Sequence, residues 1–315
     1  MDLANTDVEI RERSLPQRVD MTLRFIATRA MGVCAYAALG VVPAMIANIL
    51  LLWALDPFDA WDNLGWAWTW ALIAYLTAVE SPLVTAPLVV FLGASLFRQP
   101  ISWGAAVREV WRNSGRLLFV HGVMRTHLFW CGFTLLGYAV HSDGLLGFSL
   151  FFGVLSLLFF WCFRPYVDQI IFLERLPLFF KSAHPMTISK RSSMLHGSDV
   201  GRVMWESCVN FLLVGVVFAG TYGLLLWVYY WLTFNTVTQD WFGWTLFALA
   251  LASTMVVATV LRFFGYLDSR IRSEGWELEL RVRREAEVQM DAGVGRPRPM
   301  AGPIATAVPV SGGRA

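Results

Sequence analysis

Six apolar stretches, each long enough to cross a lipid bilayer as a helix, constrain this sequence more than any other feature. A bilayer core about 30 Å thick requires roughly 20 apolar residues at a helical rise of about 1.5 Å each. The composition agrees, because 57% of the residues are hydrophobic and 15% are charged, which is unusually apolar for a soluble domain. The sequence therefore predicts an all-α polytopic membrane protein with six transmembrane helices, at 30–54, 64–81, 117–140, 145–163, 206–234 and 243–265.

The basic residues are distributed unevenly among the segments that connect these helices. Of the 25 Lys and Arg residues, all except Arg125 lie in the terminal segments or in every second connection, and the other three connections contain none. Cytoplasmic loops of membrane proteins carry an excess of Lys and Arg. We therefore expect both termini in the cytoplasm. The basic segments are 1–29, 98–116, 164–204 and 262–315, and the three expected outer loops are 56–65, 141–144 and 235–240.

This arrangement corresponds to three helical hairpins, each followed by a basic cytoplasmic segment. It divides the chain into four parts. These are a cytoplasmic N-terminal segment (1–29), a six-helix transmembrane domain (30–268), a cytoplasmic charged helix (269–290) and a tail (291–315). The tail is rich in Gly, Pro and small residues, a composition that predicts disorder.

The stretch PISWGAAVREVWRNSGRLL (100–118) places apolar residues at helical spacing among arginines. Such a pattern predicts a cytoplasmic amphipathic helix that lies on the inner leaflet of the membrane. An ordinary cytoplasmic helix that caps the bundle is the alternative interpretation.

Two of the basic segments resemble each other. VFLGASLFRQPIS (90–102) and IFLERLPLFFKSAHPMTIS (171–189) share a Phe-Leu pair, a Phe followed by a base, and then Pro and a hydroxyl residue. Each leads to a Gly-Arg pair, Gly115–Arg116 or Gly201–Arg202, just before the next apolar stretch. The similarity indicates a weak internal repeat with a period of about 80 residues.

Glu80 is an acidic residue within an expected membrane span, two positions before Pro82. An ionisable group in a span costs a few kcal/mol and should face a partner or a wet cavity. The helical rise places Glu80 at a depth similar to that of His121 and Arg125, which are four residues apart and share one helix face. We expect Glu80 to pair with Arg125, with His121 nearby, and Pro82 to bend or end the helix. The alternative is a proton or ligand site formed by Glu80, His121, Arg125 and His127.

Further charged residues lie where the expected spans leave the membrane. Side chains at such positions commonly reach the interface and pair there. The order of a base, a Tyr and an Asp recurs in RPYVD and RFFGYLD, which favours, as an alternative, a shared cytoplasmic network between hairpins. These boundary residues are Arg164, Asp168, Glu174, Arg262 and Asp268.

Motifs that would indicate catalysis or a cofactor are absent from the sequence. It contains no Gly-x-Ser-x-Gly, no Gly-rich loop with Gly-Lys-Ser/Thr, and no His-Glu-x-x-His. The five histidines are scattered and show no metal-ligand spacing beyond a loose pair, His121 and His127. We therefore expect no catalytic residue, no metal, no cofactor and no binding to nucleic acid.

The segment YLDSRIRSEGWELEL (266–280) resembles a signature that closes the membrane domain of glycerophosphoryl diester phosphodiesterases and related bacterial multi-pass proteins. The segments at 80–97 and 164–178 are similar to parts of uncharacterised bacterial membrane proteins of that type. In the phosphodiesterases, activity resides in a separate soluble barrel for which this chain has no room. The resemblance thus implies a protein of the bacterial cytoplasmic (inner) membrane and does not imply the hydrolytic activity.

Two functions are compatible with these patterns. The favoured interpretation is a non-enzymatic scaffold or assembly component, whose arginine-rich surfaces at 98–116 and 262–284 would contact lipid or a protein partner. The alternative is a transporter or permease for a small solute or a lipid that uses the intramembrane Glu/Arg/His cluster. The sequence does not decide the oligomeric state.

Overall fold

The computed structural model describes residues 13–54, 57–96, 99–140, 142–179, 186–197, 200–234 and 241–274. Over these ranges the chain is helical and contains no strand, so the all-α prediction is confirmed for this part. The helices are α1 (Leu15–Thr28), α2 (Ala30–Ala54), α3 (Pro57–Val84), α4 (Ala86–Leu96), α5 (Trp103–Leu117), η2 (Leu118–Met124), α6 (His127–Ala139), α7 (Asp143–Phe163), α8 (Val167–Gln169), η3 (Ile170–Glu174), α9 (Ile188–Gly197), α10 (Val200–Thr233) and α11 (Trp241–Glu274).

In the described part of the chain, five helical stretches are long and apolar enough to cross a membrane. The chain therefore has the character of a multi-pass membrane protein. Most of the large apolar side chains on α7 and α10 are exposed, as expected for helices that face lipid. The five stretches are Ala30–Leu51, Trp70–Leu96, Asp143–Phe163, Val200–Thr233 and Phe242–Ser273.

The span expected at 117–140 is interrupted and does not form one continuous helix. The π-helix η2 ends at Met124, Thr126 adopts a left-handed backbone with φ of 60°, and α6 begins at His127. At the interruption the Arg125 carbonyl accepts hydrogen bonds from Thr126 Oγ1 at 2.6 Å and from Ser156 Oγ on α7 at 3.1 Å. A buried polar group needs such partners, so the contacts stabilise the break.

The expectation for Pro82 is only partly met. The chain does not leave the bundle there, because α3 continues to Val84 and α4 resumes after Thr85 with Leu88 and Leu92 fully buried. Proline removes the N–H that would bond the carbonyl four residues earlier. That carbonyl belongs to Ala78, and Ser81 Oγ donates to it at 2.8 Å. The helix therefore tolerates the proline, and the apolar stretch extends well beyond residue 81.

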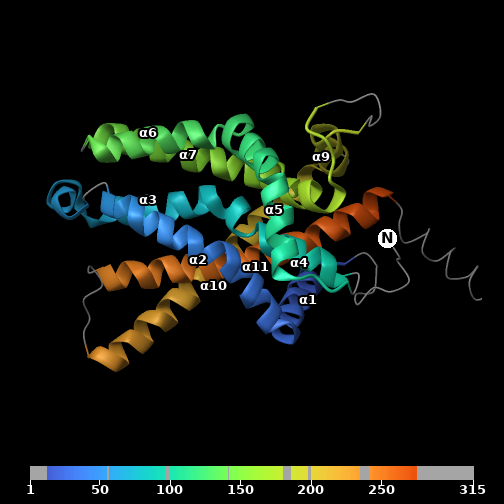
Figure 1. Cartoon of the computed structure of the whole chain (residues 1–315), viewed down its shortest axis with the longest axis horizontal. Coiled ribbons are helices and arrows are strands. Elements are labelled where there is room, and N and C mark those ends of the chain that lie inside the picture. Colours follow the sequence, from blue (N-terminus) through green and yellow to red (C-terminus); the bar gives the residue numbers. More distant parts are fainter. Residues whose placement is uncertain are drawn as a thin grey trace, which may run out of the picture.

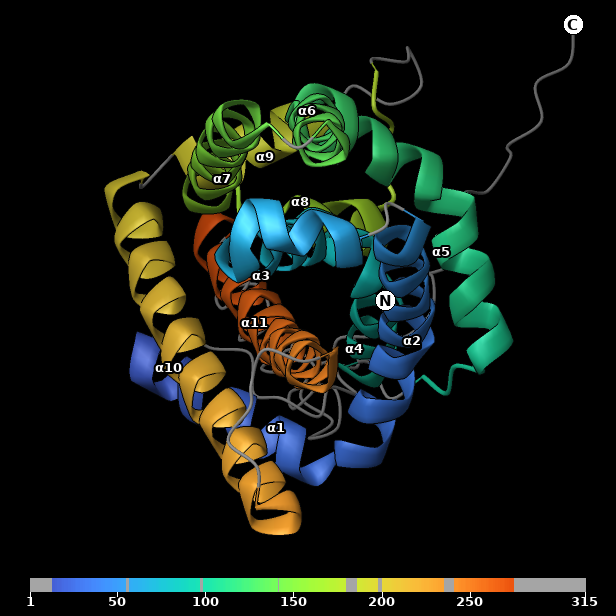
Figure 2. The same cartoon turned by 90° about the vertical axis from the view of Figure 1, so that its left-hand side faces the viewer.

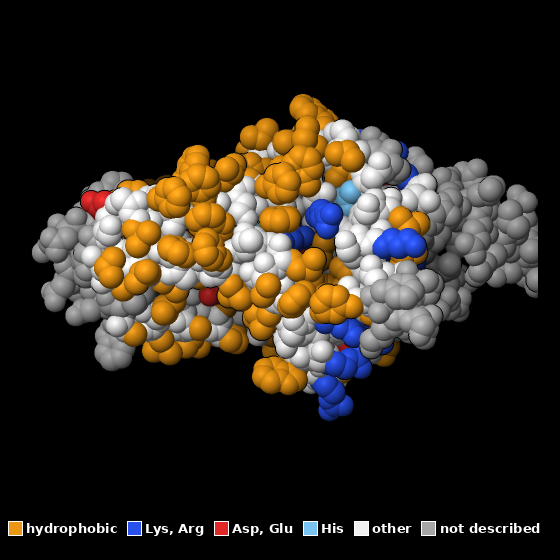
Figure 3. All heavy atoms as spheres, turned by 90° about the horizontal axis from the view of Figure 1, so that it is seen from above, with side chains coloured by type: hydrophobic (Ala, Val, Ile, Leu, Met, Phe, Trp, Pro, Cys, Tyr) orange, Lys and Arg blue, Asp and Glu red, His pale blue; other side chains and the backbone are white. Residues whose placement is uncertain are grey.

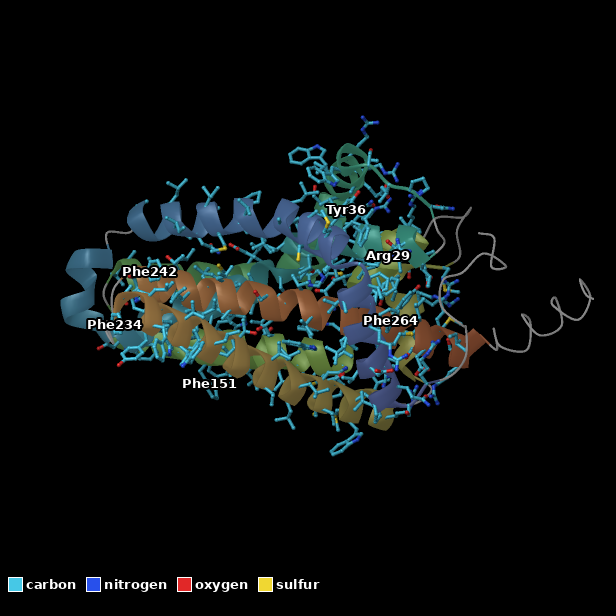
Figure 4. The ribbon with its side chains drawn as sticks, turned by 90° about the horizontal axis from the view of Figure 1, so that it is seen from below. Arg29, Tyr36, Phe151, Phe234, Phe242 and Phe264 are labelled. Atoms are coloured by element: carbon cyan, nitrogen blue, oxygen red, sulfur yellow. The ribbon has the colours of Figure 1, made fainter. Side chains whose placement is uncertain are left out.

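The long helices run side by side along the molecule (Figure 1). The C-terminal ends of α2, α6 and α10 lie at one end, whereas α1, α5 and α9 lie toward the other. Seen end-on, α3 and α11 lie inside a ring that includes α2, α5, α6, α7 and α10 (Figure 2). Phe234 and Phe242 mark the first end, and Arg29 and Phe264 lie toward the second (Figure 4).

Side-chain packing joins α3 and α10 to the central helix α11. The rings of Trp70 on α3 and Phe247 on α11 lie 4.3 Å apart, and the ring of Phe218 on α10 lies 5.3 Å from that of Phe247. Aromatic pairs at these separations add stabilisation beyond their buried area. The visible outer surface over the long helices is largely apolar, while Lys and Arg gather nearer the opposite end (Figure 3).

The close approach of α2 to α3 depends on a glycine. A Cβ atom added at Gly40 would lie 1.9 Å from the carbonyl oxygen of Val84, closer than any side chain can come. The two helices therefore pack backbone against backbone at this point.

The predicted domain boundary at 268/269 falls within a helix, because α11 runs unbroken from Trp241 to Glu274. Of the predicted N-terminal segment, residues 15–28 form α1. Residues 1–12 and 275–315, and with them the tail and most of the predicted charged helix at 269–290, lie outside the described residues.

Candidate functional site

Three polar side chains meet where the chain is irregular. His121 lies on the π-helix η2, Arg125 lies at its end, and Asp168 lies on α8 directly before the second π-helix, η3. His121 Nε2 is 2.5 Å from Asp168 Oδ1, and Arg125 Nη1 is 3.1 Å from His121 Nδ1. All three are buried. π-Helical turns are frequent at functional sites, where they redirect side chains.

The contacts of His121 fix its tautomer. An arginine guanidinium has donors only, so His121 Nδ1 must accept the bond from Arg125 and carry no proton. The other ring nitrogen, Nε2, therefore carries the proton, and its N–H donates a hydrogen bond to Asp168 Oδ1. His121 is neutral in this arrangement, and the charge of Asp168 is balanced by the surrounding arginines.

Aromatic rings and carbonyls hold Arg125 in place. Its Nη2 donates to the carbonyl of Arg164 at 3.0 Å, and its guanidinium lies 5.3 Å from the ring centre of Phe160. Arg262 on α11 is held in a similar way, with its guanidinium 4.4 Å from the ring centre of Trp161. Cation–π contacts of this kind keep a guanidinium in position without using its N–H donors.

Asp168 interacts electrostatically with both arginines as well as with His121. Burial alone would raise the pKa of its carboxyl group. The hydrogen bond from His121 and the charges of Arg125 and Arg262 outweigh that effect and hold the pKa of Asp168 below its ordinary value. The group is therefore a carboxylate, and it neutralises part of a strongly positive cluster.

A cavity of about 790 Å³ adjoins this cluster. Its walls come from α3, α7, α10 and α11 and are mostly apolar. The polar part of the wall, here called the polar cluster, consists of His121, Arg125, His127, Arg164, Asp168 and Arg262. The wall residues Phe151 and Leu155 on α7 (Phe151 is labelled in Figure 4) and Phe211 on α10 are exposed. The cavity therefore opens between α7 and α10, two helices suited to face lipid.

Three polar atoms in the cavity wall are buried and have no hydrogen-bond partner among the described residues. They are Tyr75 Oη, His127 Nδ1 and Arg262 Nε. Tyr75 and His127 are each 2% exposed. An unsatisfied buried polar group costs roughly 1–3 kcal/mol, so three around one cavity mark a place where a polar ligand group would be stabilised.

The expected pair between Glu80 and Arg125 is wrong. Glu80 Oε2 accepts a hydrogen bond from Asn48 Nδ2 at 2.9 Å, which joins α3 to α2 within the first hairpin. Glu80 does not line the cavity, although its neighbours Ser81 and Pro82 do. The four-residue cluster inferred from the sequence is therefore reduced to His121, Arg125 and His127.

The boundary charges separate into two groups. Arg164, Asp168 and Arg262 belong to the cavity, as described above. Glu174 and Asp268 instead anchor a network of ion pairs between helices. Contacts between helices of this kind correspond to the network that the sequence offered as an alternative to simple interfacial pairing.

The Tyr-x-Asp-x-Arg-x-Arg spacing has a clear structural basis in this network. Tyr266 Oη donates to Glu174 Oε1 at 2.5 Å, and Arg270 lies 3.8 Å from the same carboxylate. Two positions further on, Asp268 pairs with Arg272 at 3.2 Å and accepts the backbone N–H of Arg13 at 2.8 Å. Residues four apart share a helix face, so the motif serves two different neighbours at once.

No sequence pattern indicated the contact between His121 and Asp168, which are 47 residues apart. It also did not predict that Trp161 and Tyr75 form part of the site. Among the described residues, no group of three or more His, Cys, Asp or Glu side chains is placed to hold a metal ion.

Comparisons with family models, with curated proteins and with solved structures found no match to this chain. The relation to the phosphodiesterase membrane domain therefore stays a prediction from the motif at 266–280. The function has to be inferred from the site itself.

Proposed function

We propose that this chain is a non-enzymatic, multi-pass protein of the bacterial inner membrane that takes an amphiphilic, lipid-like molecule from the bilayer and moves it. This is the transporter interpretation in its lipid form. The observation that supports it is the cavity, which opens between two lipid-facing helices and ends at a polar cluster. Ligand cavities commonly have this volume and this combination of apolar walls with a few polar groups.

We further propose six crossings arranged as three hairpins, with both termini in the cytoplasm. The distribution of Lys and Arg supports this orientation. In that orientation the polar cluster lies near the inner surface, because Arg164 follows the last residue of α7 and precedes a basic segment. An amphiphile of the inner leaflet would then meet the cluster at the depth of its own polar headgroup.

The scaffold role is the second proposal, and we rank it lower. It requires free arginine-rich surfaces at 98–116 and 262–284. Within the described part of the second region, Arg270 and Arg272 are committed to ion pairs inside the fold. On α5, the exposed Trp103, Val107 and Trp111 repeat every four residues and suit the lipid interface, as the amphipathic-helix interpretation proposes.

Blocking the cavity tests the proposed function. Gly215 lines the cavity on α10, and a Cβ atom added there meets no atom within 4 Å. We expect Gly215→Phe to fill the cavity without straining the fold and to abolish the binding and translocation of fluorescent phospholipid by the purified, reconstituted chain. Gly220→Phe is the matched control, because Gly220 lies on the same helix, has equally open space and does not line the cavity. Equal lipid binding by Gly215→Phe and the unmodified chain would refute the proposal.

A further inference from the structure

The polar cluster and the cavity together specify the kind of lipid headgroup that would bind. We propose that the site selects a lipid with an anionic phosphate headgroup, held by Arg125, Arg164 and Arg262, with its acyl chain in the apolar part of the cavity. The inference rests on the proposed function and adds the chemical class of the ligand.

The charge of the cavity wall supports this selection. Among the described residues that line the cavity, three are arginines and one, Asp168, is a carboxylate. His121 is neutral by its tautomer. Two buried guanidinium groups, those of Arg125 and Arg262, therefore share one carboxylate, and Arg164 adds a third positive charge at the exposed end of α7. Burial makes an excess of positive charge costly. An anionic group would balance that excess.

Arg262 offers a buried donor that is available to a ligand. Arg262 is positioned by its stacking on Trp161, and its buried Nε has no hydrogen-bond partner. Arg164 is exposed at the end of α7, while Arg125 is 9% exposed. A guanidinium presents a planar set of N–H donors that matches the oxygens of a phosphate.

The remaining wall fits an acyl chain better than a second polar group. Away from the cluster, the wall consists of residues such as Leu150, Leu158 and Met255. Burial of each CH₂ group of an acyl chain contributes about 0.8 kcal/mol. The exposed wall residues Phe151 and Phe211 mark the opening through which a chain could enter from the bilayer.

The test compares headgroups on identical acyl chains. Binding of acyl-labelled phosphatidylglycerol to the full chain in detergent is competed with unlabelled phosphatidylglycerol, phosphatidylcholine or glycerol 3-phosphate. We expect phosphatidylglycerol to compete at a concentration at least about tenfold lower than phosphatidylcholine, because charge-assisted hydrogen bonds are the stronger ones. Glycerol 3-phosphate should not compete, since it lacks the chain.

Variants of Arg262 assign the preference to the site. Arg262→Met should remove most of the preference for phosphatidylglycerol, whereas Arg262→Lys, which keeps the charge, should retain much of it. Arg24→Met is the charge-matched control, because Arg24 is exposed on α1 and pairs with Asp20. The thermal midpoint of each variant shows whether it is folded. If Arg262→Met does not fold, Arg262→Lys still allows the headgroup preference to be compared with that of the unmodified chain.

The outcomes separate the two proposals. Equal competition by phosphatidylglycerol and phosphatidylcholine, with Gly215→Phe abolishing both, would overturn the headgroup selection and leave the proposed function standing. Lipid binding that is unchanged by Gly215→Phe would overturn both the proposed function and the headgroup selection. Competition by glycerol 3-phosphate as strong as that of phosphatidylglycerol would show a site for free phosphate and would also overturn the assignment to lipid.

Discussion

At the scale of single residues, the site depends on how one carboxylate is shared. Asp168 accepts a hydrogen bond from His121 Nε2, and its negative charge balances the charges of Arg125 and Arg262. His121 is neutral and lies between the two charged groups. It donates to Asp168 and accepts from Arg125, so the position of Asp168 helps to position Arg125. The position of Arg125 in turn fixes the carbonyl of Arg164 and the start of α8. One acidic side chain thus organises three segments of the chain.

Replacing this carboxylate should be costly. We expect Asp168→Asn to lower the stability of the folded chain by about 3 kcal/mol, since removing one partner leaves buried charge uncompensated. The thermal midpoint in detergent measures the change. Asp20→Asn, which breaks an exposed ion pair, should cost at most about 1 kcal/mol. An unchanged midpoint for Asp168→Asn would show that the arginines need no carboxylate.

The same variant gives a prediction for pH. The folded chain holds the pKa of Asp168 below its ordinary value, so the unfolded chain binds the proton more tightly. The stabilisation by Asp168 is therefore complete above about pH 4 and is lost as the pH falls through the folded-state pKa. The difference in midpoint between the chain and Asp168→Asn should accordingly stay constant from pH 7 to pH 5.

At the scale of helices, the irregular places are the informative ones. In α3 the missing N–H of Pro82 is compensated by Ser81. At the break between η2 and α6, Thr126 and Ser156 donate to the carbonyl of Arg125. In the two halves of the internal repeat, α5 and α9 each begin with a hydroxyl side chain that caps the helix N-terminus. Ser102 Oγ accepts the N–H of Ala105, and Thr187 Oγ1 accepts that of Lys190, each at 3.3 Å. Such N-caps satisfy the free donors at a helix start.

The packing of α2 on α3 yields a prediction at this scale. Gly40→Ala would place a Cβ atom against the backbone of Val84, which cannot rotate away as a side chain could. We expect the two helices to separate locally, with a loss of about 3 kcal/mol or more in stability. Gly132→Ala on α6 is the control, because nothing lies within 4 Å of that position. If Gly40→Ala were as stable as Gly132→Ala, the backbone contact would not exist.

The sequence predicted the helical class and the apolar stretches well, because both follow from composition and periodicity along the chain. It failed for Glu80 because depth in a membrane does not specify direction around a helix axis, and Glu80 faces Asn48 on α2. It also missed the cavity, since Tyr75, Trp161 and Arg262 come from three helices whose rotation is set by packing. The break at Arg125 is stabilised by the neighbouring Thr126 together with the distant Ser156, a pairing that local periodicity does not reveal.

At the scale of the whole molecule, the question is how often the chain crosses the membrane. The helix α7 is long and apolar enough to span a membrane, and a spanning α7 would have its two ends on opposite sides. One end joins residues 142–144, which carry no Lys or Arg, and the other joins the basic segment 164–204. The basic segment 98–116 belongs on the same side as 164–204 by the charge rule. The chain must then cross the membrane once between α5 and α7. At a rise of about 1.5 Å per residue, the 13 residues of α6 alone are too few to cross the bilayer core.

Two cysteines placed at open glycines decide whether this crossing exists. A Cβ atom added at Gly144, in the first turn of α7, or at Gly104, on α5, meets no atom within 4 Å, so both positions accept a cysteine. In a chain whose four native cysteines are replaced, a membrane-impermeant maleimide should label Gly144→Cys in intact cells and Gly104→Cys only after the cells are permeabilised. Six crossings require this difference. Labelling of both positions from the same side would mean that η2 and α6 fold back without traversing the bilayer, and the polar cluster would then lose its assigned depth near the inner leaflet.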